Sequence, residues 1–170
     1  MHKKAAGRAV GDHPAAGRPC MARCANRSVA GYGESRPRSS PMKRALNPPA
    51  IRAPFGRYSH GVAVPTGARL VFCSGQLGVK SGDLLPPTVE GQAEVCFQNI
   101  EAILAEDGMS LADVVRLNAY VTSRDHMKGY MSVRDRFVSE PLPASTLMIV
   151  AGFTRAEFLV EVEAIAAKVE

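Results

Sequence analysis

The chain has 170 residues, 46% of them hydrophobic, which is enough for one globular domain with a buried core. No run approaches eighteen apolar residues, so the sequence has no candidate transmembrane helix. The net charge of +5 belongs to residues 1–41, which carry eight Lys and Arg against two acids, whereas the rest of the chain carries thirteen against fourteen. We therefore expect the folded part to bind neither nucleic acid nor a membrane.

Residues 1–41 are rich in Gly, Pro, Ala, Ser and Arg, and their few large apolar side chains follow no helical or strand period. We expect a disordered basic tail there, because such a segment buries too little surface to offset its loss of entropy. Two alternatives stay open: an organellar transit peptide, whose amphipathic helix the Gly and Pro residues would break, or a segment outside the natural protein. We favour the latter, with a start at Met42 and a folded domain over 42–170.

Apolar periodicity after the tail predicts five strands and two helices. The strands are expected at Tyr58–Pro65, Arg69–Val79, Val114–Ser123, Ser145–Phe153 and Phe158–Val169, and the helices between Thr88 and Gly108 and at Asp125–Val138. Thr88 is the expected N-cap of the first helix and Gly108 its stop. Ser110 and Asp113 suggest a brief capped turn after it.

This order of elements favours an α+β fold, in which one sheet carries both helices on one face. No third helix is available to cover the other face of the sheet. Self-association through that face is therefore expected on physical grounds.

The cysteines give no sign of a metal site or a disulfide framework. Cys20 and Cys24 lie in the tail without a second pair or spaced histidines, and Cys73 and Cys96 lie in apolar runs. We expect the last two to be buried, unreactive thiols in a reducing cytoplasm.

Five segments of the sequence resemble the RidA family, also called YjgF. They are GRYSHGV, LVFCSGQLGV, QNIEAILAEDG, VVRLNAYVTS and VEVEAIA, in the order and spacing of the family, and the resemblance covers Pro48 to Glu170. It implies a chorismate-mutase-like fold, a homotrimer with a central β-barrel, and ligand clefts between subunits. It also implies hydrolysis of reactive 2-imino and 2-enamino acids to the 2-keto acid and ammonia, without a metal or organic cofactor.

The resemblance also assigns roles to five residues. Ser74 and Gly75 match the cleft segment of the family, where glycine lets the backbone approach a small ligand. Tyr58 matches the cleft tyrosine, Glu161 matches the glutamate that positions or activates the attacking water, and backbone groups near Leu147 would orient the substrate. From the residues alone, a plain β-bulge, a strand-edge tyrosine and a solvated carboxylate are equally compatible with these positions.

Two positions depart from the family pattern. Deaminating members clamp the substrate carboxylate with an arginine where this chain has Ser145, and serine offers one neutral bond in place of two charge-assisted ones. Met131 replaces an asparagine at the edge of the cleft. Arg134 is a candidate cation from another direction, or else an ordinary arginine paired with a nearby acid.

The sequence therefore supports two functions. The leading one is a cytoplasmic homotrimer that deaminates a small imine or enamine metabolite, with Glu161 positioning water. The alternative is a trimer that binds or senses a small metabolite without catalysis, because it has lost the arginine at Ser145.

Overall fold

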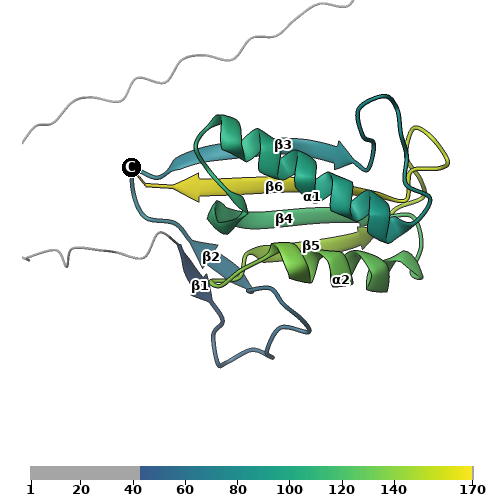
Figure 1. The fold of residues 1–170 in the computed structure, drawn as a ribbon. Coiled ribbons are helices and arrows are strands. Elements are labelled where there is room, and N and C mark those ends of the chain that lie inside the picture. Colours follow the sequence, from purple (N-terminus) through teal and green to yellow (C-terminus); the bar gives the residue numbers. More distant parts are fainter. Residues whose placement is uncertain (1–42, 170) are drawn as a thin grey trace, which may run out of the picture. The chain divides into compact units, whose positions relative to one another are not determined.

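The computed structural model describes residues 43–169, and these form an α+β fold (Figure 1). Both helices lie over the same face of a mixed β-sheet, as the order of the elements predicts. The tail expected at 1–41 and the start expected at Met42 lie outside the described residues. No helix within 43–169 is long and apolar enough to cross a lipid bilayer.

The main sheet has four strands in the order β3-β6-β4-β5, so that β3 and β5 are its edges. The strands are β3 (Arg69–Leu77), β4 (Val114–Val121), β5 (Ala144–Ile149) and β6 (Val160–Lys168). β6 runs antiparallel to both β3 and β4, whereas β4 and β5 are parallel. The parallel pair needs a crossover connection, and α2 (His126–Phe137) supplies it.

A second, two-stranded sheet pairs β1 (Arg44–Leu46) with β2 (Gly61–Ala63). It corrects two parts of the prediction, which missed β1 and placed a full strand at Tyr58–Pro65 in one common sheet. A three-residue strand is too short to show a period, and the chain loops out between β1 and β2 (Figure 1). Ser59 still joins the main sheet through a single bridge to Ala144 of β5.

Helix α1 (Val89–Glu106) confirms the predicted capping signals. The hydroxyl of Thr88 accepts a hydrogen bond from the backbone N–H of Gly91 at 3.2 Å, which satisfies one free donor of the first turn. After the helix, Gly108 has a φ of 64°, a left-handed conformation that glycine adopts without a steric penalty.

The predicted turn after α1 is also present, as a short 3-10 helix (Leu111–Asp113). The carboxylate of Asp113 accepts a hydrogen bond from the backbone N–H of Ser110 at 2.8 Å and another from its hydroxyl at 3.2 Å. This reciprocal capping box turns the chain directly into β4.

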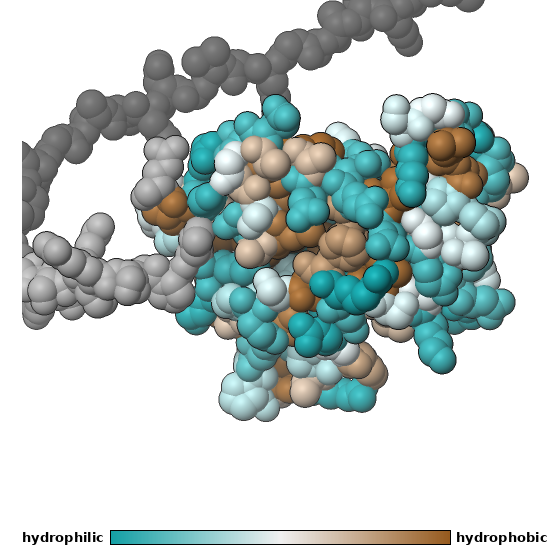
Figure 2. Space-filling model, in the orientation of Figure 1, coloured by the Kyte–Doolittle hydropathy of each residue, from teal (hydrophilic) through white to brown (hydrophobic). Residues whose placement is uncertain are grey.

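The core lies between the two helices and the sheet. In α1, Phe97 stacks on Phe137 of α2 with a centroid distance of 5.0 Å, and on Tyr130 with a distance of 6.3 Å. The fully buried side chains around this stack come from both helices, β4 and β6: Ala93, Cys96, Ile100, Leu104, Leu117, Ala119, Val121, Val133, Val160 and Val162. On the side that carries the helices, hydrophilic residues surround the apolar ones on the surface (Figure 2).

The opposite face of the sheet is not covered by any element within residues 43–169. Leu70 and Phe72 of β3 and Met148 of β5 are exposed there, and Phe72 is 70% exposed. Between these apolar edges, the side chains of β4 and β6 that alternate away from the core are mostly polar. An apolar rim of this kind favours association with another molecule.

The aromatic stack predicts a large effect of one substitution. Phe97→Ala should lower the free energy of unfolding by about 3–5 kcal/mol, because it leaves a cavity between the helices. The matched control is Phe55→Ala, since Phe55 is 80% exposed, and its effect should stay within about 0.5 kcal/mol. Urea denaturation of the two variants measures this difference, and equal effects would contradict the core described here.

Candidate functional site

The edge strand β3 is interrupted by a bulge at Ser74 and Gly75. Its ladder with β6 shifts between Cys73 and Gln76, so that the two residues between them have a single residue of β6 opposite. The side-chain amide of Gln76 donates hydrogen bonds to the carbonyl of Ser74 at 3.0 Å and to that of Gly75 at 3.5 Å. The side chain of Gln76 therefore stabilises the bulge. Ser74 itself is exposed.

The carboxylate of Glu161, on β6, lies directly over Gly75. A Cβ atom at residue 75 would overlap Oε1 of Glu161 and would lie only 2.7 Å from its Cδ. With any other residue at position 75, the Glu161 carboxylate would have to leave its place over the bulge. The structure brings together three of the residues that the sequence singled out, Ser74, Gly75 and Glu161, and we call them the β3/β6 group.

The surroundings of Glu161 raise the pKa of its carboxyl group. The larger cause is the loss of solvation on partial burial, and the smaller one is the negative charge of Glu163, two residues further along the same strand face. The side-chain carboxylate of Glu161 makes no hydrogen bond with any of the described residues. A carboxylate with a raised pKa and no hydrogen bond to the protein is a stronger base than an ordinary glutamate and has oxygens open to a water molecule.

Glu163, in contrast, belongs to a polar network on the open face. Its Oε2 accepts hydrogen bonds from the hydroxyl of Tyr120 at 3.1 Å and from the amide of Asn118 at 3.2 Å. Arg116 continues the network by donating to Asn118 at 2.9 Å and to Thr146 of β5 at 2.7 Å. The two neighbouring carboxylates therefore differ. That of Glu163 is held by hydrogen bonds, whereas that of Glu161 has no hydrogen-bond partner among the described residues.

The other candidate residues gather at the β5 edge. The N–H of Ser59 donates to the carbonyl of Pro143 at 2.9 Å, which places Tyr58 beside the start of β5. The Tyr58 hydroxyl accepts a hydrogen bond from the N–H of Phe55 at 3.2 Å. Ser145 follows Ala144 in β5 and is half-buried.

Register places Ser145 and Leu147 on the side of the sheet that the helices cover. They pair with Leu117 and Ala119 of β4, both buried in the core, and Leu147 packs against that core. Met131 of α2 is also half-buried and packs against the core. Ser145 therefore lies at a position where its side chain has limited space.

Arg134 of α2 is buried and already has a partner. Its Nε and Nη2 donate to Oδ1 of Asp135 at 3.0 and 2.7 Å, and its side chain is 5% exposed. Nη2 lies 3.7 Å from the position that a Cβ atom would take at Gly56, two residues before Tyr58. We call Tyr58, Met131, Arg134, Ser145 and Leu147 the β5 group.

The two groups of candidate residues do not meet within one chain. Glu161 pairs with Tyr120 of β4, whereas Ser145 lies two strands away and pairs with Leu117. With strands about 4.8 Å apart and residues about 3.3 Å apart along them, the separation is roughly 14 Å. The groups also lie on opposite faces of the sheet, so a small ligand cannot contact both in a single copy.

The two cysteines of the folded part are unsuited to nucleophilic attack. Both are buried, and burial raises the pKa of Cys73 above its ordinary value and that of Cys96 to about 12. Both thiols are thus buried and unreactive, as their apolar sequence surroundings predict.

The sequence prediction missed the residues that hold the bulge and the Glu163 carboxylate. Gln76 follows the serine and glycine directly and holds the bulge, but a glutamine in a strand carries no recognisable signal. Asn118 and Tyr120 were detectable in principle, because they alternate with buried residues along β4 and so must share the open face with Glu163.

The family model described as Endoribonuclease L-PSP matches residues 49–168. A 2-iminobutanoate/2-iminopropanoate deaminase of Dermatophagoides farinae is 28% identical over 125 residues, covering 72% of this chain and 94% of the relative. The protein mmf2, mitochondrial, of Schizosaccharomyces pombe is 34% identical over 84 residues, 49% of this chain and 66% of that protein. A crystal structure from Yersinia pestis, of the conserved Rid protein family, matches with a TM-score of 0.65 and 25% identity, covering 74% of this chain and 98% of that one.

This chain therefore belongs to the family of the Endoribonuclease L-PSP model, which is the RidA family that the sequence resembles. The match confirms the recognition made from five short segments. It covers the described fold from the loop before β2 to the end of β6.

The raised pKa of Glu161 predicts a change of stability with pH. When the pKa of a carboxyl group is raised in the folded state, the free energy of unfolding falls as the pH rises from the unfolded pKa, about 4.3, through the folded pKa. Glu161→Gln should therefore gain stability relative to the unsubstituted protein between pH 4 and pH 7, as measured by urea denaturation at both values.

Glu157→Gln is a control of opposite sign. The pKa of Glu157 is lowered, first by a backbone hydrogen bond and then by its bond with Arg155, so its carboxylate stabilises the fold above the unfolded pKa. Between pH 4 and pH 7, the free energy of unfolding of Glu157→Gln should therefore fall relative to that of the unsubstituted protein. The same sign for both variants would contradict the assignment.

Proposed function

We propose that this chain hydrolyses small 2-imino acids, or their enamine tautomers, to the 2-oxo acid and ammonia. The observation that carries the proposal is the carboxylate of Glu161, which has a raised pKa and lies over the Gly75 bulge without a hydrogen-bond partner among the described residues. The name of the Dermatophagoides farinae relative, a 2-iminobutanoate/2-iminopropanoate deaminase, supports the same class of substrate.

In the proposed reaction, Glu161 acts as the general base. Its carboxylate takes a proton from a water molecule while the water oxygen attacks the carbon of the C=N bond, which gives a tetrahedral carbinolamine. The protonated Glu161 returns that proton to the nitrogen, and the carboxylate then transfers the hydroxyl proton of the carbinolamine to the nitrogen, so that the C–N bond breaks, the C=O bond forms and ammonia leaves. The balance is one imine and one water to one ketone and one ammonia, and the proposal includes no cofactor.

We propose further that the site is completed by a second copy of the chain. The β3/β6 group and the β5 group lie at opposite edges of the sheet, so a site that uses both must take them from neighbouring molecules. The uncovered sheet face with its exposed Leu70 and Phe72 favours such association. A closed homotrimer with a central β-barrel, located in the cytoplasm, is the assembly that the family resemblance implies.

One observation favours a second function, the binding of a small metabolite without catalysis. Where the deaminating members carry the clamping arginine, this chain has the half-buried Ser145, and the nearby Arg134 already pairs with Asp135. A ligand with a carboxylate would lose an interaction of about 1.5–3 kcal/mol at this position. Such a loss lowers affinity without removing Glu161.

The first prediction of the proposed function concerns activity. With 2-iminopropanoate generated in the assay, the protein should accelerate its conversion to pyruvate, and Glu161→Gln should reduce the rate about a hundredfold or more. Glu157→Gln, a change of an exposed carboxylate on the adjacent loop, is the matched control and should leave the rate unchanged. No acceleration with neutral, acidic or basic imino acids would favour the binding function.

The second prediction concerns Ser145. We expect Ser145→Arg to leave the rate on 2-iminopropanoate flat and to lower the melting temperature, because residue 145 is half-buried on the helix-covered side. Ser145→Met, which adds similar bulk without charge, separates the effect of size from that of the guanidinium. A gain of roughly ten- to a hundredfold with arginine alone would instead show a cleft that lacks only the clamp.

A further inference from the structure

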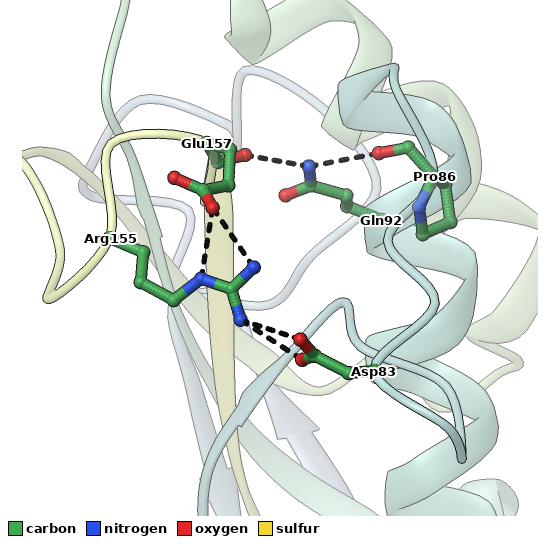
Figure 3. Close-up of polar contacts among 5 residues, drawn as sticks. All are labelled: Asp83, Pro86, Gln92, Arg155 and Glu157. Carbon is green, nitrogen blue, oxygen red and sulfur yellow. Dashed lines mark hydrogen bonds and ion pairs between the residues drawn. The ribbon is translucent and has the colours of Figure 1, made fainter.

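A buried glutamine, Gln92, joins three segments of the chain at the end of the sheet where Glu161 lies. Its side chain is 1% exposed and belongs to the first turns of α1. The amide nitrogen donates to the carbonyl of Pro86 at 3.0 Å and to that of Glu157 at 2.9 Å (Figure 3). The amide oxygen accepts from the N–H of Leu159 at 2.8 Å. The positions of the donors and acceptors fix the orientation of the amide.

Two segments in contact with Gln92 lead directly into the candidate site. Leu159 immediately precedes β6, and Glu161 is the second residue of that strand. Gly78 immediately follows β3, and a Cβ atom there would lie 2.5 Å from Cα of Gln92. The start of β6 and the end of β3 are therefore both set against the same residue.

A second, exposed set of contacts lies on the outer side of the same loops. Arg155 donates to Asp83 at 2.9 Å and pairs with Glu157 at 2.9 Å, which links the turn after β3 to the loop before β6 (Figure 3). Exposed ion pairs contribute little to stability, so these contacts support the loops less than the buried amide does.

We propose that Gln92 is a positioning residue for Glu161: its side-chain amide holds the start of β6, its main chain packs against the end of β3, and together these contacts keep the carboxylate over the Gly75 bulge. The proposal rests on the proposed function of Glu161 as the general base. A displacement of about 1 Å at a reacting group is enough to lower a rate a hundredfold.

The test uses Gln92→Met, which keeps the approximate shape of the side chain and removes all three hydrogen bonds. With 2-iminopropanoate, kcat should fall about ten- to a hundredfold while KM changes little, because the base is displaced and binding is not. Gly78→Ala is the second variant, since its methyl group would push against Gln92 from the other side and should have an effect in the same direction.

A readout that needs no activity is the titration of Glu161 in protein with 13C-labelled glutamate carboxyl groups. The titratable groups that interact electrostatically with Glu161 are Glu163 on its own strand, Tyr120 on β4 and, through the sheet, Cys96 on α1. None of them is changed in Gln92→Met. Release of the carboxylate from the bulge into water should therefore lower the pKa of Glu161 toward its ordinary value.

Ile100→Ala is the control for a merely structural effect. Ile100 is fully buried on α1, two turns from Gln92, so its truncation should lower the melting temperature without changing the Glu161 titration. If Gln92→Met folds and keeps both the kcat and the Glu161 titration of the unsubstituted protein, the proposal is wrong. If the unsubstituted protein hydrolyses no imine, the proposed function fails, and the titration alone then decides whether Gln92 positions Glu161.

Discussion

The order of the strands, β3-β6-β4-β5, decides where every candidate ligand-binding group can lie. It puts the bulge of β3 and the start of β5 at opposite edges of the sheet, with β6 and β4 between them. Since the helices cover one face, Glu161 projects from the open face while Ser145 is directed toward the covered one. A small molecule bound to one chain could therefore contact only one of the two groups of residues that the sequence singles out.

Within the β3/β6 group, sterics and electrostatics act together. The missing side chain at Gly75 leaves the space that the Glu161 carboxylate fills, and partial burial there raises its pKa. Without this space, the carboxylate at position 161 would lie in water as an ordinary solvated group. The β-bulge in β3 is thus the physical origin of the unusual surroundings of the Glu161 carboxylate.

The sequence predicted the fold better than the site, for physical reasons. Helix α1 is signalled by its own cap at Thr88 and by a long apolar period, and strand alternation marked β4 and β6. β1 is only three residues long and owes its existence to its partner, so no local pattern revealed it. Likewise, the contacts of Gln92 join segments 65 and 67 residues apart, and no spacing in the sequence reports them.

The most direct test of the divided site is complementation between two inactive variants. Glu161→Ala removes the β3/β6 group and Tyr58→Ala disrupts the β5 group, and the two proteins are unfolded together and refolded as a mixture. In a closed ring with random assembly, about one quarter of the sites would take both intact groups from neighbouring chains. The account predicts recovery of about a quarter of the unsubstituted activity on 2-iminopropanoate, whereas a mixture as inactive as its components would show that each site lies within a single chain.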